Sequence, residues 1–189
     1  MSCSKQQTGS EGHFSDAEAI QAHSLPYTRA YINYQGMLTE SKVSAISRTG
    51  EVDFLFEVDD QIHIKESYSY DEKTFRYLGD ADEHYSPGIT LLQFPFDTGD
   101  SWQWSGQYSF DETQYDSKAE IKTASERLTT LAGEYDTIVV TCNLEIDSGS
   151  LSPVLKELKF WIVPGKGIVR REIQFGASRE PMPNVSEDE

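Results

Sequence analysis

Apolar and polar side chains alternate along much of the chain between Tyr27 and Phe175. The clearest case is residues 52–58, where the even positions are Val, Phe, Phe and Val, and where Asp53 and Glu57 lie between them. Because successive side chains of a strand point to opposite faces, this alternation predicts half-buried β-strands. Turn sequences such as Arg-Thr-Gly-Glu at residues 48–51 separate neighbouring stretches. The pattern therefore predicts a mainly β, antiparallel meander.

Later stretches of the same kind extend the predicted strands towards the C-terminus. They lie around residues 119–123, 138–146, 158–162 and 168–175. Nothing in the composition divides this region, so we expect a single domain. Its two β-rich halves would form either the two layers of a β-sandwich or the two ends of one sheet.

Several residues in the turns and strands are expected to serve the scaffold. Gly99, Gly133 and Gly165 fall in predicted turns, where glycine adopts geometries that other residues resist. Gly106 interrupts a run of aromatic residues and indicates a β-bulge or a close backbone approach. Trp102 in the same run is expected to be a packing anchor that fills a large volume between the sheet and a helix.

Two neighbouring segments fit the strand pattern less well. Residues 80–88 are polar and end in Ser-Pro-Gly, which predicts a loop. Residues 89–96 are apolar but contain Pro95, which has no backbone N–H to donate. We therefore expect an edge strand or a packed loop there.

One short helix is predicted near the N-terminus. Ser15 and Glu18 form a capping-box pattern, residues 16–22 favour a helix, and Pro26 places a stop after it. One further helical turn is expected near residues 152–156. These two helical segments would be exceptions in a domain that is otherwise β-rich and covers residues 13–176. A disordered tether at 1–12 and a disordered acidic tail at 177–189 are expected to flank this domain.

The net charge of the chain limits the classes of partner that the protein can bind. The 189 residues carry a formal net charge of −16. This field repels a phosphate backbone and an anionic membrane surface, so nucleic-acid binding is excluded and direct lipid contact is disfavoured. No run of apolar residues approaches the roughly 20 that a membrane-spanning helix needs.

The two cysteines lie in very different surroundings. Cys142 shares one face of a predicted strand with Val140 and Leu144, so we expect a small buried hydrophobe rather than a catalytic thiol. Cys3 lies in a polar, Ser/Gly-containing tail, and residues 3–12 resemble the start of a mature bacterial lipoprotein, in which such a cysteine is acylated. The alternative is an unmodified N-terminal cysteine of an intracellular protein.

Three motifs in the second half carry a further resemblance. They are Phe-Pro-Phe-Asp-Thr-Gly-Asp-Ser-Trp at 94–102, Ala-Gly-Glu-Tyr at 132–135 and Trp-Ile-Val-Pro-Gly-Lys-Gly-Ile-Val at 161–169. In this order they resemble uncharacterised bacterial β-rich envelope lipoproteins. The resemblance implies a strongly curved antiparallel sheet, similar to the half-barrel of periplasmic lipoprotein carriers. It implies no catalytic residues.

Little catalytic or metal-binding chemistry is visible in the sequence. The four histidines lack metal-ligand spacing, and residues 80–84, Asp-Ala-Asp-Glu-His, are more typical of a solvated turn than of a calcium loop. Phosphate-loop, zinc-protease and nucleophile-elbow motifs are missing. We therefore expect no cofactor, no metal site and no enzymatic activity, with a hydrolase as a remote alternative.

These observations leave two main hypotheses for an exported protein of the bacterial envelope, located at the outer membrane or in the periplasm. The first is a lipoprotein whose curved sheet binds an apolar ligand or a lipid. The second is an interaction module of an envelope assembly, which grips another protein through a sheet edge or an aromatic surface.

The anchor can be tested directly. Replacing Cys3 by Ser in the full-length gene is expected to release the protein into the soluble fraction without unfolding it, because the acyl chains would supply nearly all of its membrane affinity. Membrane fractionation and a thermal melt measure the two effects. A Cys3→Ser protein that stays with the membranes would contradict the lipoprotein hypothesis.

Overall fold

The computed structural model describes residues 13–14, 22–34, 37–130, 133–149, 152–176 and 185–187. Within this part of the chain, all regular elements are strands. In chain order they are β1 (His13–Phe14), β2 (Arg29–Tyr34), β3 (Met37–Arg48), β4 (Glu51–Val58), β5 (Gln61–Tyr70), β6 (Thr74–Gly79), β7 (Glu83–Gln93), β8 (Phe96–Asp97), β9 (Ser101–Phe110), β10 (Thr113–Thr130), β11 (Gly133–Ile146), β12 (Val154–Val163), β13 (Gly167–Phe175) and β14 (Val185–Glu187).

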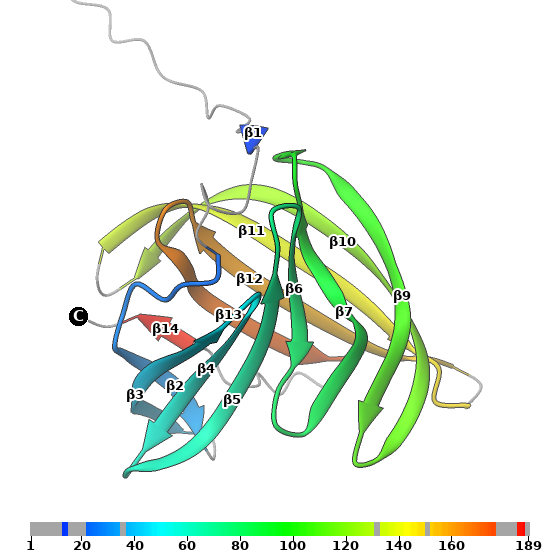
Figure 1. The fold of residues 1–189 in the computed structure, drawn as a ribbon, viewed down its shortest axis with the longest axis horizontal. Coiled ribbons are helices and arrows are strands. Elements are labelled where there is room, and N and C mark those ends of the chain that lie inside the picture. The colour runs from blue at the N-terminus through cyan, green and yellow to red at the C-terminus, as the bar shows by residue number, and fades with distance from the viewer. Residues whose placement is uncertain are drawn as a thin grey trace, which may run out of the picture.

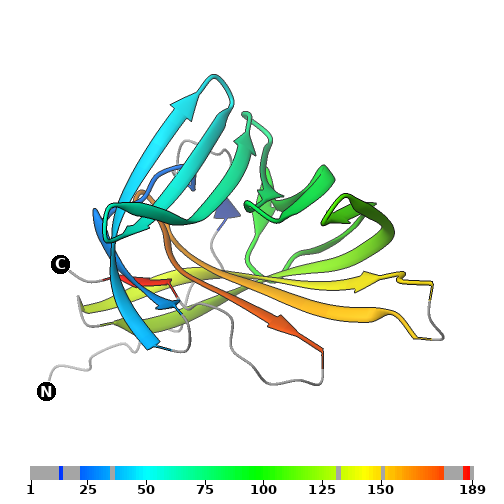
Figure 2. The ribbon, with the colours of Figure 1, turned by 90° about the horizontal axis from the view of Figure 1, so that it is seen from below.

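One strongly curved antiparallel sheet contains every described strand except β1 and β8, which pair with each other. From β2 to β13 the sheet follows the chain as a meander and curls into a half-barrel (Figures 1 and 2). The short strand β14 lies between β13 and β2 and closes the ring of hydrogen-bonded strands. The expected mainly β half-barrel is therefore confirmed, and the β-sandwich alternative is not found.

Local irregularities help the sheet to curve. Register shifts interrupt the pairing of β4 with β5 after Phe56, of β6 with β7 after Phe75, and of β12 with β13 after Trp161. Such bulges bend a strand and increase its twist. A flat sheet could not bring β2 and β13 close enough for one strand to pair with both.

Aromatic side chains fill the concave side. Rings from neighbouring strands contact one another in a continuous series: Phe54 with Tyr68, Tyr68 with Phe75 and Tyr77, Tyr77 with Tyr85, and Tyr85 with Trp104 and Tyr108. Phe160 of β12 lies against Tyr68 and Tyr77 from the opposite wall. The interior is thus a packed core.

The aromatic run of β9 is packed mainly through Trp104. Trp104 is buried, and its indole N–H donates to the carbonyls of Pro87 and Gly88. Trp102 is only partly buried; its indole N–H donates to the Thr90 carbonyl over 2.7 Å, and its ring lies against Phe96. At Gly106, a Cβ atom would lie 2.7 Å from the Ser86 carbonyl oxygen, which confirms the predicted close backbone approach.

Some local predictions do not match the structure. The expected helical turn near residues 152–156 is wrong, because Val154 already begins β12 and pairs with Ile146. The loop expected over residues 80–88 is limited to its start, because β7 begins at Glu83. Pairing of β7 with β9 ends at Ser86, so the missing N–H of Pro87 costs no hydrogen bond to β9.

Both predicted flanking regions fall largely on residues that the structure does not describe. The expected helix at 16–22 and the tether at 1–12 lie outside the described residues, except for Ala22, which is in a turn. In the tail predicted to be disordered, Val185–Glu187 form β14, and the remaining tail residues lie outside the described part. Among the residues that are described, there is no helix long and apolar enough to cross a membrane.

Cys142 is fully buried on the concave face of β11, as the alternation predicts. Burial raises the pKa of its thiol to about 12. Since the thiolate is the reactive form, the folded protein should protect this residue from thiol reagents.

In a Cys3→Ser variant, which keeps Cys142 as its single cysteine, we expect slow labelling by a maleimide under native conditions and rapid labelling in guanidinium chloride. Mass spectrometry of timed samples measures both rates. Equal rates in the two conditions would show that Cys142 is not in the core.

Candidate functional site

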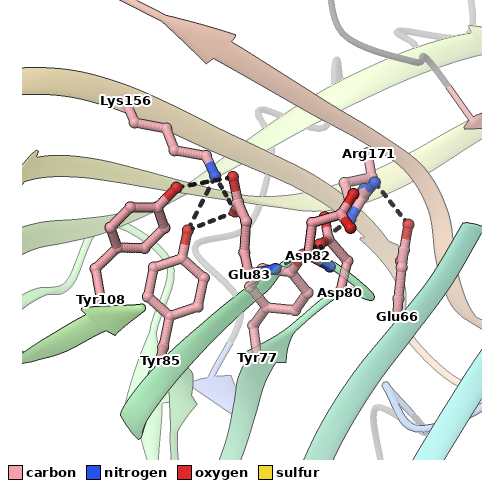
Figure 3. Close-up of polar contacts among 9 residues, drawn as sticks. All are labelled: Glu66, Tyr77, Asp80, Asp82, Glu83, Tyr85, Tyr108, Lys156 and Arg171. Carbon is pink, nitrogen blue, oxygen red and sulfur yellow. Dashed lines mark hydrogen bonds and ion pairs between the residues drawn. The ribbon is translucent and has the colours of Figure 1, made fainter. Parts of the chain in front are cut away.

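Four charged side chains project into the packed interior. Glu66 lies on β5, Glu83 on β7, Lys156 on β12 and Arg171 on β13, and all four residues are buried. Each occupies a position on the inward-facing side of its strand, where the other residues are apolar or aromatic. Figure 3 shows that they converge from opposite walls of the half-barrel. We refer to these four residues as the buried ion-pair cluster.

The first ion pair joins Lys156 to Glu83. The Lys156 ammonium also donates to the Tyr85 hydroxyl oxygen over 3.0 Å. Both Tyr85 and Tyr108 donate their hydroxyl hydrogens to the Glu83 carboxylate, each over 3.1 Å. The ring centroid of Phe175 lies 4.7 Å from the Lys156 nitrogen. The charge of Lys156 is therefore compensated by a carboxylate and by aromatic faces.

The second ion pair joins Arg171 to Glu66. Arg171 Nη2 lies 2.7 Å from Glu66 Oε1, although the two groups are not aligned as a hydrogen bond. Arg171 Nη1 donates to the Tyr77 hydroxyl over 3.2 Å, and the Tyr68 hydroxyl donates to Glu66 Oε2 over 2.7 Å. Arg171 Nε has no hydrogen-bond partner among the described atoms.

A tight turn between β6 and β7 places Glu83 in this cluster. Asp80 Oδ1 accepts hydrogen bonds from the backbone N–H groups of Asp82 and Glu83, each over 3.0 Å. Gly79 has φ +127°, and a Cβ atom there would lie 2.1 Å from the Glu83 carbonyl oxygen, so the turn requires glycine at this position. The acidic stretch at 80–84 thus contains a turn and the start of β7, and its Glu83 carboxylate faces inward.

Burial and the neighbouring opposite charge act in opposite directions on the pKa values of Glu66 and Lys156. Burial raises the pKa of Glu66, while Arg171 and the Tyr68 hydroxyl oppose that rise. Burial lowers the pKa of Lys156, and the neighbouring Glu83 carboxylate opposes that fall. Asp80 lies close enough for its charge to favour the charged forms of Lys156 and Arg171. The charged forms of Glu66 and Lys156 are therefore favoured by the opposite charge that lies beside each of them.

The cluster is sealed from solvent. The exposed fractions of the side chains are 0% for Lys156 and 6% for Glu83, and 3% for both Arg171 and Glu66. A catalytic group must contact its substrate. These four side chains instead contact one another, the neighbouring tyrosines and the Phe175 ring. The arrangement is suited to holding β5 and β7 to β12 and β13 across the interior.

Two open depressions lie on the outer side of the sheet, with volumes of about 510 and 400 Å³. Lys118 and Glu145 line both. The larger one crosses strands β9 to β13, and its outward residues in register include Glu120, Asn143 and Glu157. The walls of the larger depression combine polar side chains with the exposed Leu155.

Among the residues proposed from the sequence, Cys142 lies close enough to Lys156 of the buried cluster for the ammonium charge to act on its thiol. Gly99 and Gly165 adopt positive φ in turns, and Gly133 adopts positive φ as the first residue of β11. Cys3 lies outside the described residues. Within the described part of the chain, no group of three or more His, Cys, Asp or Glu side chains is placed to hold a metal ion.

The buried cluster was not predicted from the sequence, although one signal is present: charged residues occupy inward positions of the strand pattern. Glu66 shares its alternation with Ile64 and Tyr68, and Lys156 shares its alternation with Leu158 and Phe160. A charged residue at an inward position indicates a buried partner. The pattern does not say which residue that partner is.

Comparisons of the chain with known proteins returned two solved structures. No family model matches the chain, and no curated protein matches its sequence. The hypothetical lipoprotein YmcC from Escherichia coli is 12% identical over 86% of this chain and 85% of that chain, with a TM-score of 0.49. A provisionally assigned lipoprotein from Parabacteroides distasonis is 13% identical over 87% of this chain and 95% of that chain, with a TM-score of 0.47.

The buried ion pair predicts a large difference between two lysine substitutions. Lys156→Met leaves Glu83 buried without a counter-ion and is expected to destabilise the protein by about 3–5 kcal/mol. Lys118→Met removes an exposed ion pair with Glu145 and should leave the unfolding midpoint unchanged. Urea denaturation measures both variants.

A Glu83→Gln/Lys156→Met double variant should recover part of the loss, because no unpaired charge remains buried. If Lys156→Met were as stable as Lys118→Met, the Lys156 ammonium would not be in the interior.

Proposed function

We propose that the protein is an exported lipoprotein, held at the cell envelope by acyl chains on Cys3, and that its β domain binds another protein without catalysing a reaction. The N-terminal sequence supports the anchor, because a cysteine followed by a polar tether is typical of mature lipoproteins. Ser4 directly after the cysteine favours the outer membrane among the envelope locations.

The filled interior is the observation that carries the proposed binding mode. A carrier of apolar ligands needs an apolar cavity that takes up most of the ligand surface. Here the aromatic rings and the two ion pairs occupy the concave side. Binding would then use the outer surface and the strand edges, where protein partners dock.

Large apolar side chains at strand ends support this mode. Met37, Leu38 and Ile62 are exposed near the β2–β3 and β4–β5 turns, and Phe110 is exposed at the β9–β10 turn. In an antiparallel meander these turns lie at the same end of the sheet. The net charge of −16 disfavours an anionic membrane as the binding partner of this end.

Native mass spectrometry of the protein purified from its own host in mild detergent tests the proposal. We expect an acylated chain, a complex with a second protein, and no lipid beyond the covalent anchor. As a matched control, the soluble Cys3→Ser protein titrated with a fluorescent fatty-acid analogue should show no saturable binding. Stoichiometric binding of that analogue, or a host-derived lipid in place of a protein, would overturn the proposed mode.

A further inference from the structure

One of the two buried ion pairs holds a primary amine against a carboxyl group in a sealed interior. Lys156 contacts Glu83, and both side chains are buried. The backbone around each residue is fixed by strand pairing, with Glu83 opposite Phe110, and Lys156 between Leu144 and Phe175. Well-oriented groups within one molecule can reach effective molarities of about 10⁵–10⁸ M. The two groups are therefore placed for a reaction with each other.

Tyr85 connects the nitrogen of Lys156 to the carboxyl group of Glu83. Its hydroxyl oxygen accepts a hydrogen bond from the ammonium over 3.0 Å, and its hydroxyl hydrogen is donated to Glu83 Oε2 over 3.1 Å (Figure 3). A proton can pass through this hydroxyl from the nitrogen to Oε2, which leaves a neutral amine beside a neutral carboxylic acid. Burial lowers the pKa of Lys156 and so favours the neutral amine, which is the nucleophilic form.

Tyr108 points at the other oxygen of the same carboxyl group. Its hydroxyl donates to Glu83 Oε1 over 3.1 Å. If the amine adds to Glu83 Cδ, negative charge develops on Oε1, where this donor is already in place. Such donors lower the barrier to acyl transfer. Burial raises the pKa of the Tyr108 phenol, which keeps it protonated as a donor.

We propose that Lys156 and Glu83 condense after folding to an intramolecular amide bond, with Tyr85 as the proton carrier and Tyr108 as the donor to the oxyanion. The Lys156 Nζ–Glu83 Cδ bond forms and the Cδ–Oε2 bond breaks. Of the three ammonium protons, two leave with Oε2 as water and one remains on the amide nitrogen. No electrons are exchanged, and the net charge of the pair stays zero. This modification concerns the chain itself and does not depend on the proposed function.

The surroundings of the pair favour the amide over the ion pair. The ring centroids of Phe175, Tyr108 and Tyr85 lie 4.7, 5.5 and 5.7 Å from the Lys156 nitrogen. These rings help to exclude the water that hydrolysis would need. The amide is uncharged, so the desolvation cost of two buried charges is removed. The Arg171 pair cannot follow the same route, because a guanidinium stays protonated in proteins.

Intact mass spectrometry of the folded, full-length Cys3→Ser protein tests the bond. We expect a mass lower by one water than the mass that the sequence gives. A protease digest should contain one branched peptide that joins the segments around Glu83 and Lys156. The exposed pair of Lys118 and Glu145, with 2.9 Å between nitrogen and oxygen, is the matched control within the chain, and its peptides should be linear.

Two variants in the Cys3→Ser background separate the reacting groups from their helpers. Lys156→Arg keeps the positive charge but cannot condense, so its mass should equal the mass of its own sequence. Tyr108→Phe keeps the ring and both reacting groups and removes only the donor to Oε1. In timed samples from cell-free synthesis, Tyr108→Phe should lose water about 100-fold more slowly than the Cys3→Ser parent.

Three results would overturn the assignment: a folded parent that keeps its full mass after prolonged incubation, a Lys156→Arg protein that still lacks one water, or a branched peptide that joins other residues. The first and third of these results need no further variant, so the test stands even where Lys156→Arg does not fold. Loss of water from Tyr108→Phe at the parent's rate would refute the role of the Tyr108 hydroxyl.

Discussion

A charge inside a β-sheet costs several kcal/mol of desolvation free energy unless an opposite charge and hydrogen bonds compensate it. This constraint shapes the interior of the half-barrel. Lys156 needs Glu83 and Arg171 needs Glu66, and each pair links strands that are not neighbours in the sheet. The pairs therefore fix how far apart the two walls lie, which an apolar core alone would specify less strictly. The aromatic rings then fill the space that this distance leaves.

Under the proposed function, the same constraint leaves recognition of a partner to the outside of the molecule. A wall-to-wall ion pair cannot admit a ligand between its charges without breaking, and a broken pair leaves two buried charges uncompensated. The side chains of the interior therefore contribute to the stability and the shape of the half-barrel. Edges, turns and the outer face remain available for recognition.

Much of the fold could be predicted from the sequence, because strand alternation is a local signal. Cys142 was placed correctly by its neighbours Val140 and Leu144 alone. The buried cluster could not be predicted, because the partner of Lys156 is 73 positions away and only the curvature of the sheet brings it close. The helical turn expected near residue 152 fails for a similar reason: pairing with β11 decides the conformation of Val154, and that pairing is a tertiary effect.

The ring of strands joins residues near the two ends of the polypeptide. Ala30 and Tyr31 pair with Glu187 and Ser186, so this contact spans most of the chain length. During synthesis or export, β2 emerges first, and its free edge is covered only after β14 has emerged. Contacts of such high sequence separation form slowly, and an edge left open in the meantime is exposed to aggregation. The ring of strands can therefore close only after the meander from β2 to β13 has been synthesised.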